Sequence, residues 1–198
     1  MMRCDPRRRI GNGSIASAAA LLAMAFSPPL AAQQRVLPAQ SEVAFTSRQM
    51  GVPVQGRFRA FDAQLEFDPK QPEVARIVLR IDLASASIGA AETEAELAKP
   101  GWFDTYRFPQ ASFTSSRVKA AGPGRFDVTG TLMLKGTSRE LTVPVTLLQA
   151  GPATTASGSF AIRRLDYRIG EGDWSDTSLV ADEVQVKFRL TLAGVPLP

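Results

Sequence analysis

Two adjacent arginines, Arg163 and Arg164, end an alternating apolar run and are the side chains of this sequence best suited to bind an anion. A guanidinium group offers a planar fork of N–H donors that matches a phosphate in two-point geometry. Phe160 and Ile162 set the phase of the run, which turns Arg164 inward and Arg163 outward on a strand. Arg164 is therefore predicted to meet a phosphate group of a ligand or, alternatively, to form a structural ion pair. The candidate partners of that ion pair are Asp166 and Asp104.

Two groups of carboxylates have the residue types that bind divalent cations. Glu92, Glu94 and Glu96 fall in an Ala- and Leu-rich segment, where Glu92 and Glu96 could share one face of a helix. This spacing is not that of a calcium-binding loop, so a solvated helix face is the favoured interpretation. The second group surrounds Trp174 and consists of Asp173, Asp176, Asp182 and Glu183. Carboxylates scattered through a Gly-containing loop are more typical of turns and strand caps, so no metal site is predicted.

The composition excludes several common catalytic centres. The sequence contains no histidine, which excludes Ser-His-Asp and Cys-His nucleophiles and histidine ligands for zinc or haem. Its one cysteine, Cys4, lies in a segment that is predicted to be removed. Asp104 and Tyr106 are spaced for an acid–base pair, but no Gly-rich phosphate loop or other catalytic motif accompanies them. Neither enzymatic activity nor a cofactor is predicted.

Residues 1–32 have the three parts of a secretory signal peptide. Met1–Arg9 is basic, Ile15–Phe26 is apolar or small, and Leu30-Ala31-Ala32 ends on a small residue. The apolar stretch has about a dozen residues, whereas a membrane-spanning helix needs about 20. We therefore expect cleavage near Ala32 and export to the periplasm, by the general route or, through Arg8-Arg9, by the twin-arginine route.

Removal of this leader changes the charge of the chain. The full sequence has 23 basic and 19 acidic residues, and the leader holds four of the basic and one of the acidic ones. The remaining residues 33–198 are therefore nearly neutral, with acidic and basic side chains interspersed. Such a surface does not suit nucleic acid, and this length is typical of a single domain.

Apolar and polar residues alternate with a period of two along most of residues 33–198, which is the pattern of half-buried strands. The alternation begins at Val43 and Phe45. The further predicted strands are Arg57–Phe67, Ala75–Leu83, Ala111–Ala120, Phe126–Leu134, Glu140–Leu148, Ser157–Arg164 and Glu183–Leu192. Phe58 is out of phase with the residues after it, so a bulge is expected near Arg59-Ala60. Ala90–Lys99 instead has the composition of a short helix.

About eight antiparallel strands with one apolar face form either a sandwich or a closed barrel. A ligand of such an interior would be apolar; alternatively, the inward side chains simply fill the core. The candidate lining residues are Phe45, Phe61, Leu65, Ile77, Leu79, Phe113, Phe126, Leu132 and Phe160. Trp102, Phe103 and Phe108 lie in a loop with Pro and Gly, where they would either gate an apolar mouth or plug a barrel end.

A series of short motifs stands out along these strands. They are Ser41-Glu42-Val43-Ala44-Phe45, Val54-Gln55-Gly56-Arg57-Phe58, Leu65-Glu66-Phe67-Asp68, Trp102-Phe103-Asp104, Phe108–Ser115, Gly130–Thr137, Arg164–Gly170 and Asp182-Glu183-Val184. In this order and spacing they resemble the YceI-like family of exported lipid-binding proteins, from about Ser41 to Leu192. The resemblance implies an all-β fold, an eight-stranded antiparallel lipocalin-like barrel with one short helix, which holds a polyisoprenoid or other lipid in the periplasm.

The same resemblance implies no catalytic residues, because the family shares no catalytic constellation. Many members carry an Arg-Asp-x-His-Leu motif where this chain has Thr93–Leu97, so any role of that histidine is absent here. The expected function is therefore a binding protein that carries or sequesters a polyisoprenoid, an isoprenoid quinone or a prenyl phosphate. Arg164 is then the candidate headgroup donor, beside the mouth aromatics.

The alternative is a filled barrel that binds no lipid and presents its loops to an envelope partner. The expected partners are a lipid and, transiently, a membrane or an envelope protein, and the sequence leaves a homodimer open.

The leader generates the first prediction. Protein released by osmotic shock from cells that express the full chain should begin within a few residues of Gln33, because the small-residue boundary precedes it. N-terminal sequencing checks this. Recovery of intact Met1–Arg9 on a membrane-bound form would contradict cleavage.

Overall fold

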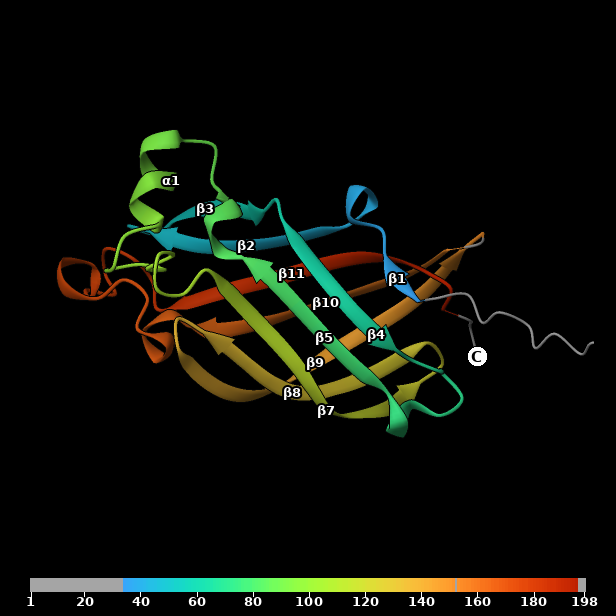
Figure 1. Cartoon of the computed structure of the whole chain (residues 1–198). Helices are drawn as coiled ribbons and strands as arrows, with labels where there is room; N and C mark the ends of the chain where they lie inside the picture. The colour runs from blue at the N-terminus through green and yellow to red at the C-terminus, as the bar shows by residue number, and fades with distance from the viewer. Residues whose placement is uncertain (1–33, 152, 196–198) are drawn as a thin grey trace, which may run out of the picture. The chain divides into compact units, whose positions relative to one another are not determined.

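The alternating segments form one antiparallel sheet that curls around an apolar interior (Figure 1). The structure is a computed structural model and describes residues 34–151 and 153–195; the predicted leader and its cleavage site lie outside these ranges. Within them the chain is mostly β, with one α-helix and several short 3-10 helices, as the predicted fold class requires. No helix in these ranges is long and apolar enough to cross a membrane.

Most of the strands that are consecutive in the chain are also neighbours in the sheet. They are β1 (Arg35–Val36), β2 (Glu42–Gln49), β3 (Val52–Phe58), β4 (Phe61–Glu66), β5 (Arg76–Asp82), β6 (Ala86–Ser87), β7 (Gln110–Gly122), β8 (Arg125–Leu134), β9 (Thr137–Ala150), β10 (Ala153–Arg163) and β11 (Glu183–Ala193). Their order is β4-β5-β7-β8-β9-β10-β11-β2-β3-β6, and β1 pairs with β11. The helix α1 spans Ala91–Leu97, within the predicted segment. The 3-10 helices span Pro38–Gln40, Pro72–Val74, Leu83–Ser85, Arg164–Tyr167 and Gly172–Trp174.

The two ends of this strand order meet because two strands are bent. β3 pairs with β2 and β6, whereas β4, which follows it after Arg59 and Ala60, pairs with β5. Backbone hydrogen bonds from Arg59 to Ser85 and from Asp82 to Ala60 join the two pairs across the bend. The bulge expected near Arg59-Ala60 is thus a full break between two strands.

This bend explains the difference between the predicted and the observed strand count. The sheet has eleven strands when every segment in the described residues is counted. When β3–β4 and β5–β6 are each taken as one bent strand and the two-residue β1 is set aside, the predicted eight-stranded antiparallel barrel remains.

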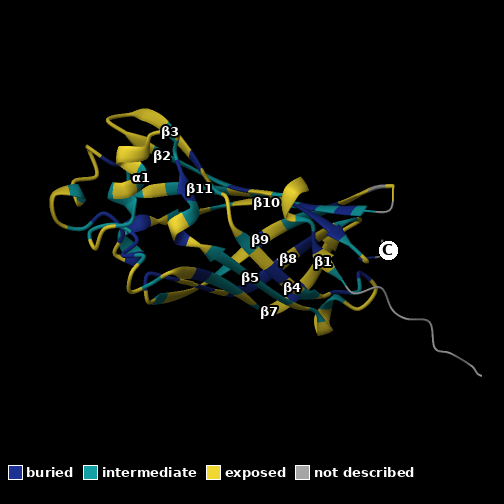
Figure 2. Cartoon of the chain, turned by 45° about the horizontal axis from the view of Figure 1, so that its top comes forward, coloured by how far each residue is buried: buried dark blue, intermediate teal, exposed yellow. Residues whose placement is uncertain are grey.

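Buried and exposed residues alternate along the strands (Figure 2). In β8, buried Phe126, Val128 and Leu132 alternate with exposed residues such as Asp127 and Met133. Because a shift of register by one residue would exchange the two faces, this pattern fixes the strand pairing.

Three strand glycines give phenylalanine rings room against the inner wall. The glycines are Gly56, Gly130 and Gly158, and the rings are those of Phe45, Phe113 and Phe188. In each pair the ring lies where a Cβ atom on the glycine of the neighbouring strand would be. The width of the interior therefore depends on residues without side chains.

Sheet pairing is interrupted at the end of the barrel that carries α1. β9 pairs with β8 from Thr137 to Thr146, but with β10 only from Val145 to Ala150. Pro144, which has no N–H to donate, stands where the pairing with β10 ends. Beyond it, the 3-10 helix Arg164–Tyr167 contacts both strands. Connecting segments, rather than the sheet alone, therefore close this end.

The helix α1 is attached to β6 through Glu94. Its carboxylate accepts hydrogen bonds from the hydroxyl of Ser87 and from the backbone N–H groups of Ile88 and Gly89. These donors, with Ser87 the strongest, hold the pKa of Glu94 below its ordinary value. The interpretation of this helix as only a solvated acidic face is therefore wrong for Glu94, which anchors the helix.

Gly158→Ala is expected to destabilise the barrel. The added methyl group would lie 2.5 Å from the carbonyl oxygen of Pro144 and 2.7 Å from Cζ of Phe188, and such overpacking costs about 1–3 kcal/mol. Gly101→Ala is the matched control, because its nearest neighbour would be the carbonyl oxygen of Glu171 at 3.9 Å. Urea unfolding measures the stability of both variants. Equal unfolding midpoints would contradict the prediction, because they would mean that the Pro144 carbonyl and the Phe188 ring move aside at little cost.

Candidate functional site

The barrel encloses two apolar cavities at different positions along its length. The first has a volume of about 140 Å³ and lies toward the end that carries β1. It exposes only apolar atoms, and its lining includes Val36, Leu65, Phe67, Leu79, Phe126 and Leu192. This part of the interior offers no hydrogen bond to a ligand.

The second cavity has a volume of about 120 Å³ and lies toward the α1 end. Its lining includes Phe45, Ser47, Phe58, Trp102, Phe103 and Arg164. Six side chains border both cavities, namely Val43, Ile81, Ala111, Leu132, Phe160 and Val186. The two cavities are therefore neighbouring parts of one interior.

The size and lining of the first cavity favour an apolar occupant. The cavity has a volume of about 140 Å³, and apolar space left empty inside a fold is unfavourable because its lining atoms lose packing contacts. Water is a poor occupant, because a buried water needs two to four polar partners. Methylene groups, in contrast, gain van der Waals contacts with every wall.

Arg164 is the one charged residue among the described residues that line the cavities, and it is only 1% exposed. Its guanidinium donates to five backbone carbonyls: Nε to Ala181 at 3.1 Å, Nη1 to Ile169 and Gly170 at 2.9 Å, and Nη2 to Trp174 and Val180 at 2.7 Å. A guanidinium has five N–H donors, so every one of them is engaged.

We call the five carbonyls around the Arg164 guanidinium the carbonyl cage. The cage requires a glycine at position 170, and burial inside it changes the pKa of Arg164. Gly170 has a φ of +73°, and a Cβ atom there would collide with Nη1, so glycine lets this carbonyl approach. Burial lowers the pKa of the Arg164 guanidinium, and the carboxylate of Asp182 opposes that shift.

These contacts correct part of the expectation for the two arginines. The side chain of Arg164 does turn inward, and Arg163 lies outside, where it pairs with Asp182 at 2.8 Å. The proposed ion pair of Arg164 with Asp166 or Asp104 is wrong, because its donors bind carbonyls instead. Those aspartates pair with Arg139 at 3.4 Å and with Arg107 at 3.6 Å, respectively. A headgroup role for Arg164 stays a prediction, and it requires a phosphate to displace a carbonyl.

A second buried cation, Lys135, joins the two connecting segments of this end. Its Nζ donates to the carbonyls of Pro100 at 2.8 Å and of Arg168 at 2.5 Å. Burial lowers the pKa of its ammonium group, and Glu171, at 3.6 Å, opposes the shift. Residues 98–109 and 164–182 thus form one structure, which we call the cap. In the sequence Lys135 precedes a glycine and has the features of an ordinary turn residue, so its buried position was not predicted.

The three predicted mouth aromatics have different positions in the cap. Trp102 and Phe103 border the second cavity, whereas Phe108 does not. The ring of Phe103 packs 6.1 Å from that of Phe58 and is buried, and the ring of Trp102 packs 5.6 Å from that of Trp174.

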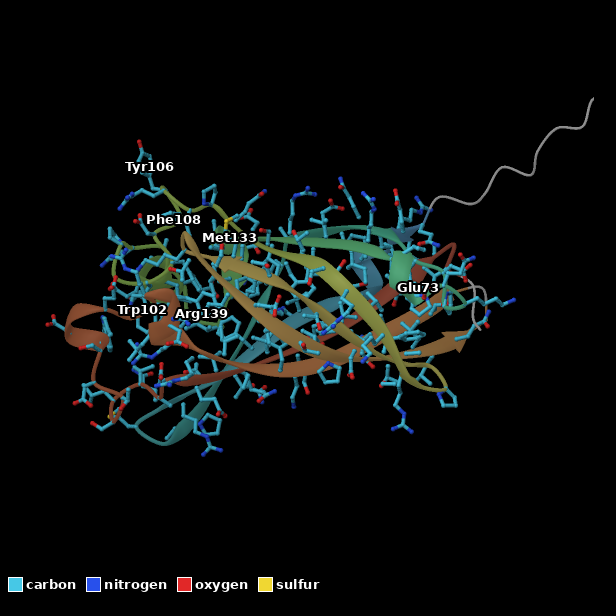
Figure 3. All side chains as sticks on the ribbon, turned by 90° about the horizontal axis from the view of Figure 1, so that it is seen from below. Glu73, Trp102, Tyr106, Phe108, Met133 and Arg139 are labelled. Atoms are coloured by element: carbon cyan, nitrogen blue, oxygen red, sulfur yellow. The ribbon has the colours of Figure 1, made fainter. Side chains whose placement is uncertain are left out.

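Phe108 instead packs on the β8–β9 turn. Its ring lies against Gly136, and the guanidinium carbon of Arg107 is 5.3 Å from its centroid. Figure 3 shows Phe108 beside Tyr106 and Met133 at the capped end of the barrel, with Glu73 at the other end. Two of the three aromatics are therefore placed to contact an occupant of the interior.

Members of both acidic groups have structural partners. Glu96 pairs with Lys99 at 2.6 Å, and Asp182 accepts hydrogen bonds from Arg163 and from the backbone of Leu165. Asp176 accepts one from the backbone N–H of Ser178. In the part of the chain that the structure describes, no three such side chains gather into a metal-binding cluster.

A sequence model of the YceI-like domain matches residues 35–192, which is most of the chain. The chain belongs to the YceI-like family. The resemblance based on short motifs is thereby confirmed, and the fold it implies is the fold observed.

Solved and curated proteins agree with this YceI-like membership. The structure is similar to that of BcnA from Burkholderia cenocepacia, with a TM-score of 0.76 and 42% identity, covering 79% of this chain and 98% of that one. A polyisoprenoid binding domain from Saccharophagus degradans has a TM-score of 0.67 and 18% identity, covering 82% of this chain and 98% of that one, which shows the fold alone. Protein YceI of Escherichia coli O157:H7 is 33% identical over 96 residues, 48% of this chain. The alignment spans 50% of that relative's length.

Most of the predicted lining residues of this YceI-like barrel do face the interior. Those that border a cavity are Phe45, Leu65, Ile77, Leu79, Phe113, Phe126, Leu132 and Phe160. Phe61 packs against the hydrophobic core without bordering either cavity. That these residues touch a lipid stays a prediction. Ser47 also borders the second cavity, but it was not predicted, because it is a polar residue outside the short motifs.

Arg164→Met is expected to destabilise this YceI-like fold strongly, by more than about 3 kcal/mol. It leaves five carbonyls without their donor, and each unsatisfied buried group costs about 1–3 kcal/mol. The control is Arg163→Met, whose exposed ion pair with Asp182 is worth at most about 1 kcal/mol. Denaturant unfolding compares the two variants, and similar midpoints would mean that the cage contributes little.

Proposed function

We propose that this YceI-like protein is exported to the periplasm, where it binds a long-chain amphiphilic lipid inside its barrel and carries or sequesters it. The pair of consecutive apolar cavities is the observation that carries the proposal. A hydrocarbon or isoprenoid chain can follow both cavities. A small polar molecule would leave its polar groups without partners in the first cavity, at a large cost in free energy.

Burial of the chain supplies enough free energy for binding. About ten methylene units contribute roughly 8 kcal/mol, at about 0.8 kcal/mol each, and an isoprenoid chain contributes more. After the costs of association, a dissociation constant near the micromolar range is expected. The length and width of the chain then select the lipid.

Further observations support the proposal. The similar domain from Saccharophagus degradans is described as polyisoprenoid binding. Residues 1–32 have the features of an export leader. Catalysis is not part of the proposal, since the sequence has no catalytic motif and the donors of Arg164, the charged residue at the cavities, are all engaged.

Leu132→Glu is expected to abolish lipid retention. Leu132 borders both cavities and is 8% exposed, so the carboxylate would be buried beside the lipid chain without a partner. Met133→Glu is the matched control, because the adjacent side chain is 46% exposed on the outer face. Native mass spectrometry and solvent extraction of each protein, purified from the periplasm of the producing cells, measure the bound lipid, and circular dichroism checks the fold.

Two outcomes would contradict the proposal. Wild-type protein without extractable lipid would favour a barrel that serves an envelope partner instead. Equal lipid content in folded Leu132→Glu and Met133→Glu would place the lipid outside the cavities.

A further inference from the structure

The pairing of β9 with β10 stops part-way along both strands and leaves a seam in the barrel wall. The ladder between these strands ends at the pair Val145 and Gly158. Beyond it, residues 137–144 of β9 pair with β8 alone, and residues 159–163 of β10 pair with β11 alone. We call these two facing edges the seam. No backbone hydrogen bond joins them in the part of the chain that the structure describes.

Pro144 accounts for the position of the seam. In an antiparallel ladder, the N–H and C=O groups of one residue point to the same neighbouring strand. The carbonyl oxygen of Pro144 points toward β10, since a Cβ atom on Gly158 would lie 2.5 Å from it. The N–H that proline lacks is therefore lacking on the β10 side, and the ladder cannot continue there.

The strand pairs on either side of the seam are complete. Every residue of β8 pairs with β9, and every residue of β10 pairs with β11. Parting either of these pairs would leave a row of backbone groups without partners, which is strongly unfavourable. Parting the two edges of the seam breaks no such row. The seam is therefore the weakest line in this part of the wall.

Both ends of the interior are fastened by hydrogen bonds. At the capped end, Arg164 donates to five backbone carbonyls and Lys135 to two. At the other end, the side chain of Gln34, next to β1, exchanges two hydrogen bonds with the backbone of Phe67, next to β4, at 2.7 and 2.8 Å. Opening either end for a lipid would break several of these bonds.

Apolar side chains and one ion pair close the seam. Leu141 of β9 and Phe160 and Ile162 of β10 pack against the same hydrophobic cluster. Arg139 of β9 also donates to the carbonyl oxygen of Asp166 at 3.2 Å and pairs with its carboxylate at 3.4 Å. We call this ion pair the latch, and Figure 3 shows Arg139 at the capped end of the barrel. The Arg139 side chain is 49% exposed, so the latch contributes little stability.

The seam lies directly beside the interior. Val143 of β9 borders the first cavity, Ile162 of β10 borders the second, and Phe160 borders both. Parting of the seam would therefore connect both cavities with the outside, between apolar side chains that suit a hydrocarbon chain.

We propose that the seam is the route by which the lipid enters and leaves the barrel, and that the latch governs how fast this route opens. β9 and β10 part sideways, the lipid chain passes between Leu141 and Ile162, and the latch then closes behind it. The inference rests on the proposed lipid binding and adds the route of entry. A route determines rates but not the equilibrium, so blocking it should slow uptake and release by the same factor.

A reversible cross-link across the seam tests this route. Cys4→Ser removes the native cysteine of the chain, and Thr142→Cys with Ala161→Cys then places one exposed thiol on each edge of the seam. A bis-maleimide with a disulfide in its spacer joins the two thiols. The probe is cis-parinaric acid, a fluorescent long-chain amphiphile, added to protein that has been freed of its own lipid.

Stopped-flow fluorescence measures uptake of the probe and its release into excess oleic acid. Cross-linking before the probe is added should slow uptake by at least about tenfold, and cross-linking after loading should slow release as much. Reduction of the spacer should restore both rates. Ser159→Cys with Lys187→Cys is the matched control, because these exposed residues are partners in the complete ladder of β10 with β11. Its cross-link should change neither rate.

Two single substitutions should move the rates in opposite directions. Arg139→Gln removes the latch and should speed uptake and release by up to about fivefold, the scale of an exposed ion pair. Pro144→Thr supplies an N–H on the β10 side and should slow both by about fivefold to tenfold, the scale of one hydrogen bond. Lys99→Gln is the control for the latch, because it breaks the exposed ion pair with Glu96 beside α1. It should leave both rates unchanged.

The results distinguish this inference from the proposed function. If the seam cross-link and the control cross-link give equal rates, the lipid uses another route, while lipid binding stands. If the seam cross-link slows uptake but Arg139→Gln and Lys99→Gln have equal rates, the latch does not govern opening. If wild-type protein takes up no cis-parinaric acid, both proposals fail.

Discussion

The hydrogen bonds between Arg164 and five backbone carbonyls are the interaction on which the capped end of the barrel depends. A buried cation is tolerated only when its donors are satisfied, and the loop carbonyls in turn need donors when they are buried. Lys135 likewise satisfies its charge by donating hydrogen bonds to the backbone carbonyls of Pro100 and Arg168. Two cations thus hold the cap together where pairing between β9 and β10 has ended.

This arrangement gives the two ends of the interior different chemistry. The sheet alone produces an apolar wall, because alternation places every second side chain inside. The cap adds aromatic rings and Arg164, whose donors are all bonded to backbone carbonyls, so the second cavity is bordered by a polar side chain without a free charge. The first cavity is lined by apolar atoms alone, whereas the second is bordered by the buried guanidinium of Arg164 and by the aromatic rings of the cap.

The sequence was sufficient to predict the barrel wall because alternation is a local signal that each strand carries by itself. It also gave the inward direction of Arg164. It could not supply the partners of that side chain, since one of the carbonyls, that of Ala181, lies 17 residues further along the chain in an irregular loop. Lys135 and Ser47 were missed for a related reason. A turn lysine and a strand serine are ordinary locally, and only the three-dimensional structure shows that Lys135 binds cap carbonyls and that Ser47 borders the second cavity.

The pairs of glycine and phenylalanine on neighbouring strands allow substitutions to change the width of the barrel interior locally. At Gly56, Gly130 and Gly158 the local diameter is set by one ring and one missing side chain rather than by the whole wall. A smaller residue in place of Phe45, Phe113 or Phe188 would widen the passage locally and leave the backbone unstrained, whereas a side chain on the glycine would force the wall apart. Because Phe45 borders the second cavity and the other two rings border the first, substitutions at these pairs can change the width of each cavity separately.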